Sequence, residues 1–141
     1  MAEVVARFGN SQRRRELLVN LLDYRALLAT DGYVSGLQFI DGSFTENVET
    51  IRGRAPDDID VFSFLSAPSK YHKDPNLWAQ QGFHFWQQNV ADRDANKSRF
   101  SLDTYAALIE ELGIGGVIEK SIYWYSLFAH QRDTFAWKGF V

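Results

Sequence analysis

Cysteine is absent from the sequence, which excludes disulfide bonds and thiolate metal ligands. The sequence also lacks an apolar run of the roughly 20 residues that a membrane-spanning helix needs. Its first residues, MAEVVARFGN, do not place a basic segment before an apolar one, as a secretory signal does. From these absences we expect a cytoplasmic protein that has no membrane partner.

Charge of one sign is not in large excess either. The chain carries 15 Lys and Arg residues against 18 Asp and Glu residues, so its net charge of -3 offers no attraction to nucleic acid or to an anionic membrane. Arg13, Arg14 and Arg15 form the one basic cluster in the sequence, and we expect it to be the solvated flank of a helix. A polyanionic ligand would therefore have to be held locally, by a few cations or by a metal ion.

Repeats and linker-like segments are also missing, and 141 residues with 45% hydrophobic content predict one domain, residues 1–141, with its own core. Hydrophobic periodicity predicts the elements of that domain. They are a helix that begins after Ser11 and ends before Asp31, strands at 34–40 and 59–65, a helix at 75–90, a strand at 100–108 whose continuation could run into a helix, a helix at 118–130 and a strand at 134–141. This order predicts an α/β (α+β) fold in which a short mixed β-sheet is flanked by helices.

An acidic motif stands out in residues 41–62, DGSFTENVETIRGRAPDDIDVF. In a strand, Asp58 and Asp60 would share one face about 7 Å apart, where two carboxylates repel unless a cation joins them. Oxygen ligands without cysteine suit Mg²⁺ or Mn²⁺. Taken alone, the pair favours a solvated junction between a loop and a strand over a metal site.

Two further features favour a site. Gly42 lets the backbone approach a ligand closely, and its amide and the Ser43 hydroxyl can donate to phosphate oxygens. Asp103 stands in an otherwise apolar strand, where a charge needs either solvent or a partner. A metal held by carboxylates beside a phosphate-binding turn is the equipment for phosphoryl or nucleotidyl transfer.

The C-terminal segment adds two candidate phosphate contacts, Arg132 and Lys138, whose alternative is a charged cover over a sheet edge. Aromatic residues of the last predicted helix could stack a base, but the spacing of Trp124 and Phe128 favours core packing. Exposed aromatics in this region could also support a homodimer.

The order Gly42-Ser43, spacer, Asp58-Ile59-Asp60 and later Asp103 resembles the nucleotidyltransferase superfamily, typified by DNA polymerase beta and the minimal nucleotidyltransferases. Together with the tail YWYSLFAHQRDTFAWKGFV, it is similar over most of the chain to small bacterial and phage nucleotidyltransferase-like proteins. The resemblance implies a nucleotidyltransferase fold in which Asp58, Asp60 and Asp103 hold Mg²⁺ ions, Asp103 helps to activate the attacking hydroxyl, and Gly42 and Ser43 hold the phosphates of the nucleotide.

The sequence departs from that pattern in three ways. The spacer from residue 44 to residue 57 has 14 residues, which is longer than usual, and Asp57 stands where the closer group often has Asn. The chain also lacks the second domain with which larger transferases bind their acceptors.

The resemblance implies Mg²⁺-dependent transfer of a nucleoside monophosphate from an NTP to a hydroxyl on a protein, an RNA or a small molecule. The alternative is a catalytically inactive binding module that acts through a protein partner. Analogy with stand-alone minimal transferases suggests one half of a toxin-antitoxin pair or a phage-defence system.

Overall fold

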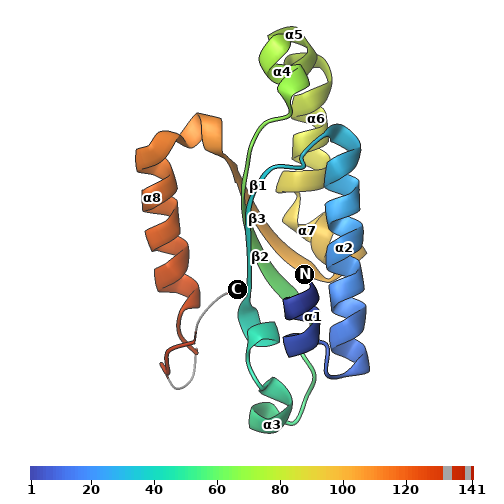
Figure 1. The fold of residues 1–141 in the computed structure, drawn as a ribbon, viewed down its shortest axis with the longest axis vertical. Coiled ribbons are helices and arrows are strands. Elements are labelled where there is room, and N and C mark those ends of the chain that lie inside the picture. The colour runs from blue at the N-terminus through green and yellow to red at the C-terminus, as the bar shows by residue number, and fades with distance from the viewer. Residues whose placement is uncertain (132–134, 139–140) are drawn as a thin grey trace.

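The sheet at the centre of the fold has three strands in the order β1-β2-β3 (Figure 1). β1 (Gly36–Asp41) runs antiparallel to β2 (Ile59–Leu65), and β2 runs parallel to β3 (Leu102–Leu108). These positions come from a computed structural model, which describes residues 1–131, 135–138 and 141. The helical elements of these residues are α1 (Ala2–Phe8), α2 (Gln12–Asp31), η1 (Gly42–Thr45), α3 (Val48–Arg52), α4 (Ser69–Lys73), α5 (Pro75–Leu77), η2 (Trp78–Gly82), α6 (Phe83–Phe85), η3 (Trp86–Ala91), α7 (Arg93–Phe100) and α8 (Ile109–Phe128).

Helices cover both faces of the sheet, with α2, α6 and α7 on one side and α8 on the other (Figure 1). Successive side chains of a strand point to opposite faces, so alternate residues of β2 enter two different cores. Val61 is buried in the core beneath α2, whereas Phe62 and Phe64 pack against Trp124 of α8. Asp60 is two residues before Phe62, and its side chain therefore lies on the α8 face.

The expected fold class is confirmed as a mixed α/β arrangement with a short mixed sheet and flanking helices. The first predicted helix is α2, where the Ser11 hydroxyl accepts from a backbone N–H of the first turn and Gly32 ends the helix in a left-handed conformation. β2 has the predicted bounds. β1 begins at Gly36 rather than at residue 34, and β3 begins at Leu102 because Phe100 is the last residue of α7.

The last helix is longer than the sequence indicates, because α8 begins at Ile109 and not at residue 118. Gly113, at φ 60°, kinks it, and glycine-rich sequence lowers the helical signal there. Trp124 and Phe128 are buried as predicted. The helix expected over 75–90 is present as a helical run from 75 to 91 that includes two π-helical stretches, η2 and η3. In the described part of the chain, no helix combines the length and the apolar character needed to cross a membrane.

The prediction of a strand over 134–141 is wrong for residues 135–138 and 141, which the structure describes without a strand. Trp137 forms an isolated bridge with His130, and Val141 exchanges two backbone hydrogen bonds with Ile40 of β1. Residues 134, 139 and 140 lie outside the described residues. The short helices α1, α3, α4 and α7 were not expected, since helices of this length depend on tertiary packing more than on local sequence.

Arg14 is buried, which corrects the expectation that the whole basic cluster is a solvated flank. Its guanidinium donates to the two carboxylate oxygens of Glu49 at 2.7 and 2.8 Å. It also donates to the backbone carbonyl groups of Phe44 and Glu46, at 2.6 Å each. The same contact with Arg14 lowers the pKa of Glu49. These charge-assisted bonds tie α2 to the segment that follows β1.

We expect Arg14→Ala to lower the free energy of unfolding by about 2 to 4 kcal/mol, because it leaves a carboxylate and two carbonyl groups without their donor. Urea unfolding at pH 7 measures this change. Arg15→Ala, at an exposed neighbouring position, is the matched control and should cost less than about 1 kcal/mol. Equal losses in the two variants would contradict the role assigned to Arg14.

Candidate functional site

Three aspartates stand in register across the sheet. Asp41 of β1 pairs with Asp60 of β2, and Asp60 pairs with Asp103 of β3. Paired residues on neighbouring strands project from the same face, with their Cβ atoms about 5 Å apart. Asp58 precedes Asp60 by two residues and shares its side of the chain. Four carboxylates are therefore gathered at one end of the face that carries α8.

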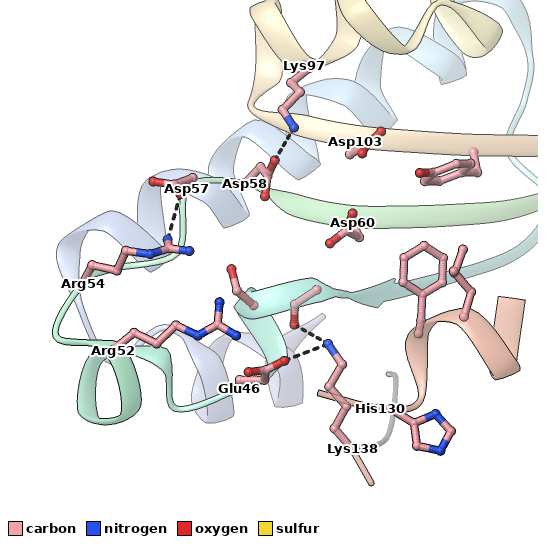
Figure 2. Close-up of a pocket in the computed structure, with 15 residues that line it drawn as sticks. Glu46, Arg52, Arg54, Asp57, Asp58, Asp60, Lys97, Asp103, His130 and Lys138 are labelled. Carbon is pink, nitrogen blue, oxygen red and sulfur yellow. Dashed lines mark hydrogen bonds and ion pairs between the residues drawn. The ribbon is translucent and has the colours of Figure 1, made fainter. Parts of the chain in front are cut away.

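Asp58, Asp60 and Asp103 line a cleft of about 640 Å³ together with Gly42 and Ser43 (Figure 2). Gly42 has a left-handed backbone with φ 77°, and a Cβ atom at this position would lie 1.9 Å from Oδ2 of Asp60. Only glycine allows the turn and this carboxylate to approach so closely. The other residues that line the cleft are Glu46, Arg52, Arg54, Asp57, Lys97, Tyr105, Leu127, Phe128, His130 and Lys138.

Helix α7 supplies cations to two of the carboxylates. Lys97 lies 2.8 Å from Asp58, an ion pair drawn in Figure 2, and Arg93 lies 2.7 Å from Asp103. Arg93 also donates to the Tyr105 hydroxyl at 2.7 Å. The spacing of four residues places both cations on one face of α7. The ion pairs raise the pKa of Lys97 and of Arg93.

Lys138 approaches the cleft from the C-terminal segment (Figure 2). Its ammonium lies 3.2 Å from Asp41 and 2.9 Å from Glu46, and it donates to the carbonyl oxygen of Gly42 at 3.0 Å. An ammonium has three N–H bonds, and these three partners can use all of them. Lys138 therefore connects the turn at Gly42 to the buried Asp41.

Asp60 is the member of the group for which the described residues provide no ion pair. Burial first, and then the charges of Asp58, Asp103 and Asp41, raise its pKa to about 6, while the charge of Lys138 opposes them. Burial also raises the pKa of Asp41, and the nearby Lys138 lowers it in part. A negative charge on Asp60 is thus held at an unfavourable place in the folded protein.

The donor set fits a hard divalent cation. Oδ2 of Asp41 is buried without a hydrogen-bond partner, and Asp60 has a raised pKa, so both carboxylates would gain from a nearby cation. The neighbouring acidic groups offer only oxygen ligands, which suits Mg²⁺ or Mn²⁺. As the side chains lie, no three acidic or imidazole groups of the described residues converge on one point. Two of the carboxylates are bonded to the cations of α7 instead.

The sequence-predicted site residues come together with one exception. The cleft is lined by Asp58, Asp60, Asp103, Gly42, Ser43 and Lys138. Arg132 lies outside the described residues, and its role stays a prediction. Asp57 is exposed and pairs with Arg54 at 2.7 Å.

Sequence reasoning missed Asp41, Glu46, Arg93 and Lys97. Asp41 directly precedes Gly42, and the end of a strand that is followed by a turn is a signal that could have found it. Arg93 and Lys97 have the spacing of one helix face directly before a strand. That signal requires α7 to be recognised first.

Comparisons with known proteins give one finding. The model of a family whose description is "Family of unknown function (DUF6932)" matches residues 1–141. The search of curated proteins and the search of solved structures gave no match. The geometry of the cleft therefore carries the functional argument.

Asp60→Asn tests the charge of this site through stability. The pKa of Asp60 is raised to about 6 from 3.8, so the folded protein holds this proton more tightly than the unfolded chain does. The resulting stabilisation is fully present below the unfolded pKa and is lost as pH rises through about 6. At pH 8 we expect Asp60→Asn to raise the free energy of unfolding by up to about 3 kcal/mol, and we expect the gain to fade near pH 4.

Urea unfolding of both proteins at the two pH values measures the effect. Asp57→Asn removes an acidic side chain that is 81% exposed, and we expect little change from it at either pH. A gain for Asp60→Asn that is the same at pH 4 and pH 8, or a loss at pH 8, would show that Asp60 is not held in an unfavourable charged state.

Proposed function

We propose that this chain, which belongs to DUF6932, a family of unknown function, is a nucleotidyltransferase that depends on Mg²⁺ or Mn²⁺. The reaction would move a nucleoside monophosphate from an NTP to a hydroxyl acceptor. The observation that carries the proposal is the row of Asp41, Asp60 and Asp103, held in register beside the turn at Gly42. A surface cluster of acids needs neither this alignment nor a glycine fitted against one of its carboxylates.

Asp58, Asp60 and Asp103 are the residues that would hold the metal, with Oδ2 of Asp41 as a neighbouring oxygen. When bound, the metal supplies positive charge that offsets the carboxylates and polarises the phosphate of the nucleotide. For this to happen, Asp58 and Asp103 must exchange their present cation partners for the metal. The exchange leaves two positive side chains of α7 at the side of the cleft.

Those two side chains then have a second use. Lys97 lines the cleft, and its ammonium suits a phosphate oxygen once Asp58 has turned to the metal. Arg93 offers a forked donor for the same purpose. Gly42 and Ser43 bind phosphate oxygens through backbone amides and the serine hydroxyl. Lys138 is fully engaged by protein oxygens, so we assign it to positioning the turn rather than to contact with the ligand.

The transfer step follows from these roles. The oxygen of the acceptor hydroxyl forms a bond to the α-phosphorus, and the bond from that phosphorus to the oxygen that bridges to the β-phosphate breaks. Pyrophosphate is released, and the proton of the hydroxyl passes to the carboxylate of Asp103. Arg52 and Arg54 line the same cleft to one side of the aspartates (Figure 2), and we place the acceptor on that side.

Incubation with each labelled NTP and Mg²⁺ or Mn²⁺, with and without cell extract as a source of acceptors, tests the proposal. We expect a labelled product and released pyrophosphate. Asp60→Asn should lower the rate about 100-fold or more, because it removes one of the carboxylates that would hold the metal, and the metal offsets the charge of the transition state. Since this variant is expected to be at least as stable as the natural chain at pH 8, its loss of activity cannot come from unfolding. Asp57→Asn is the control, and turnover that Asp60→Asn leaves unchanged would exclude the assignment.

A second candidate function is supported by one observation. Asp58, Asp103 and Asp41 already have cation partners within the fold, so three of the four carboxylates are neutralised without metal. A binding module that acts through a protein partner would have this property. Nucleotide binding that does not depend on Mg²⁺, together with a stable hetero-oligomer on gel filtration, would favour it over the transferase.

Exchange of partners at Asp58 makes a separate prediction. If Lys97 competes with the metal for this carboxylate, Lys97→Met should tighten Mn²⁺ binding about two- to fivefold in the absence of nucleotide. This factor corresponds to the free energy of one exposed ion pair, which the metal no longer has to break. Electron paramagnetic resonance of Mn²⁺ measures the affinity. Lys120→Met, on an exposed position of α8, should leave it unchanged. Weaker Mn²⁺ binding by Lys97→Met would mean that Lys97 does not compete with the metal.

A further inference from the structure

The outer edge of β1 is an open strand edge over part of its length. Ile40 exchanges two backbone hydrogen bonds with Val141 on this edge, so its N–H and C=O groups point away from β2. In an antiparallel pair the backbone groups of every second residue point the same way. Gly36 and Gln38 alternate with Ile40 along β1, so their N–H and C=O groups also point outward. No backbone group of the described residues forms a hydrogen bond with them on that side. In Figure 1 this edge faces the viewer between α2 and α8. Open edges of this kind are templates for another strand.

A groove of about 400 Å³ runs beside this part of β1. Its walls expose apolar and polar surface in equal measure and come mainly from the end of α2, from β1 and from the segment between them. They include Leu28, Ala29, Val34 and Leu37, and Val34 is 78% exposed. Exposed apolar side chains along an open strand edge promote pairing with other chains, so such an edge commonly marks an interaction site.

One charged group lines the groove. Arg25 is half-buried, and its Nε donates to the carboxamide oxygen of Gln38 at 2.6 Å, while that carboxamide donates to Ser63 at 3.1 Å. Burial lowers the pKa of Arg25. No carboxylate of the described residues forms an ion pair with it, so a guanidinium is held in place with donors to spare.

We propose that the outer edge of β1 binds an extended peptide segment of a partner protein by strand addition, with an acidic side chain of the peptide paired to Arg25. The backbone of the peptide would pair with Gly36 and Gln38, and alternate apolar side chains would enter the groove. A bidentate carboxylate is the natural ligand of a fixed guanidinium. The proposal does not depend on nucleotide chemistry in the cleft.

Charge favours an acidic peptide over a second copy of this chain. Residues 34–38, VSGLQ, contain no carboxylate. Pairing two copies through this edge would place both Arg25 side chains on one face of the joined sheet with nothing in the segment to offset them. A peptide with Asp or Glu at the matching position removes that repulsion.

Selection of decapeptides from a random library against the folded full chain tests the proposal. We expect binders with alternating apolar residues and one Asp or Glu, and we expect them to slow hydrogen exchange at the amides of Gly36 and Gln38. Methylation of the peptide nitrogens that face β1 should abolish binding. Arg25→Gln should weaken binding about tenfold or more, since a hydrogen bond to a charged group is lost. The peptide affinity of Arg25→Lys should lie between those of the natural chain and Arg25→Gln, because lysine keeps the positive charge but lacks the two parallel N–H donors of the guanidinium.

Arg7→Gln, in α1 and away from the groove, is the matched control and should bind as the natural chain does. The methylated peptides keep the test valid if a protein variant fails to fold. Selected peptides that protect other amides would overturn the proposal, as would binding that survives methylation or Arg25→Gln. A selection without binders, or a dimer of this chain that occupies the edge, would overturn it as well.

Discussion

The register of three strands is the constraint on which the site depends. Because Asp41, Asp60 and Asp103 occupy paired positions, their carboxylates cannot separate without breaking the sheet. The chain meets the resulting repulsion with cations from two distant segments, α7 and the C-terminal residues. Both segments are thereby tied to the sheet, so the architecture around the cleft follows from the need to balance one row of charge.

The balance is incomplete at Asp60, and we interpret this as the functional part of the arrangement. A fold selected only for stability would place an apolar or amide side chain here, since burial and three neighbouring acids raise the pKa of Asp60. Gly42 is likewise fitted to the carboxylate, because any side chain would overlap Oδ2 of Asp60. Strain of this kind is commonly kept where a ligand relieves it.

Much of this could be predicted from the sequence, and the exceptions have physical reasons. Alternation in an apolar strand was enough to place Asp60, but Asp41 stands at a strand end that periodicity does not define. Arg14 was misread because its partners are distant in the chain, and Glu49, for example, lies 35 residues away. Arg93 and Lys97 were overlooked since α7 has eight residues and forms through packing rather than through local propensity. Local pattern thus located Asp58, Asp60 and Asp103, and tertiary contacts decided which cations meet Asp58 and Asp103.

Diffraction from crystals grown with Mn²⁺ and a non-hydrolysable NTP analogue, recorded at the manganese absorption edge, tests the central claim most directly. The account predicts an anomalous peak within coordination distance, about 2.2 Å, of oxygens from Asp58, Asp60 and Asp103. It also predicts that Lys97 has left Asp58 and that the phosphates lie against Gly42 and Ser43. Nucleotide bound in the cleft with no manganese peak among these aspartates, or manganese bound elsewhere, would contradict it.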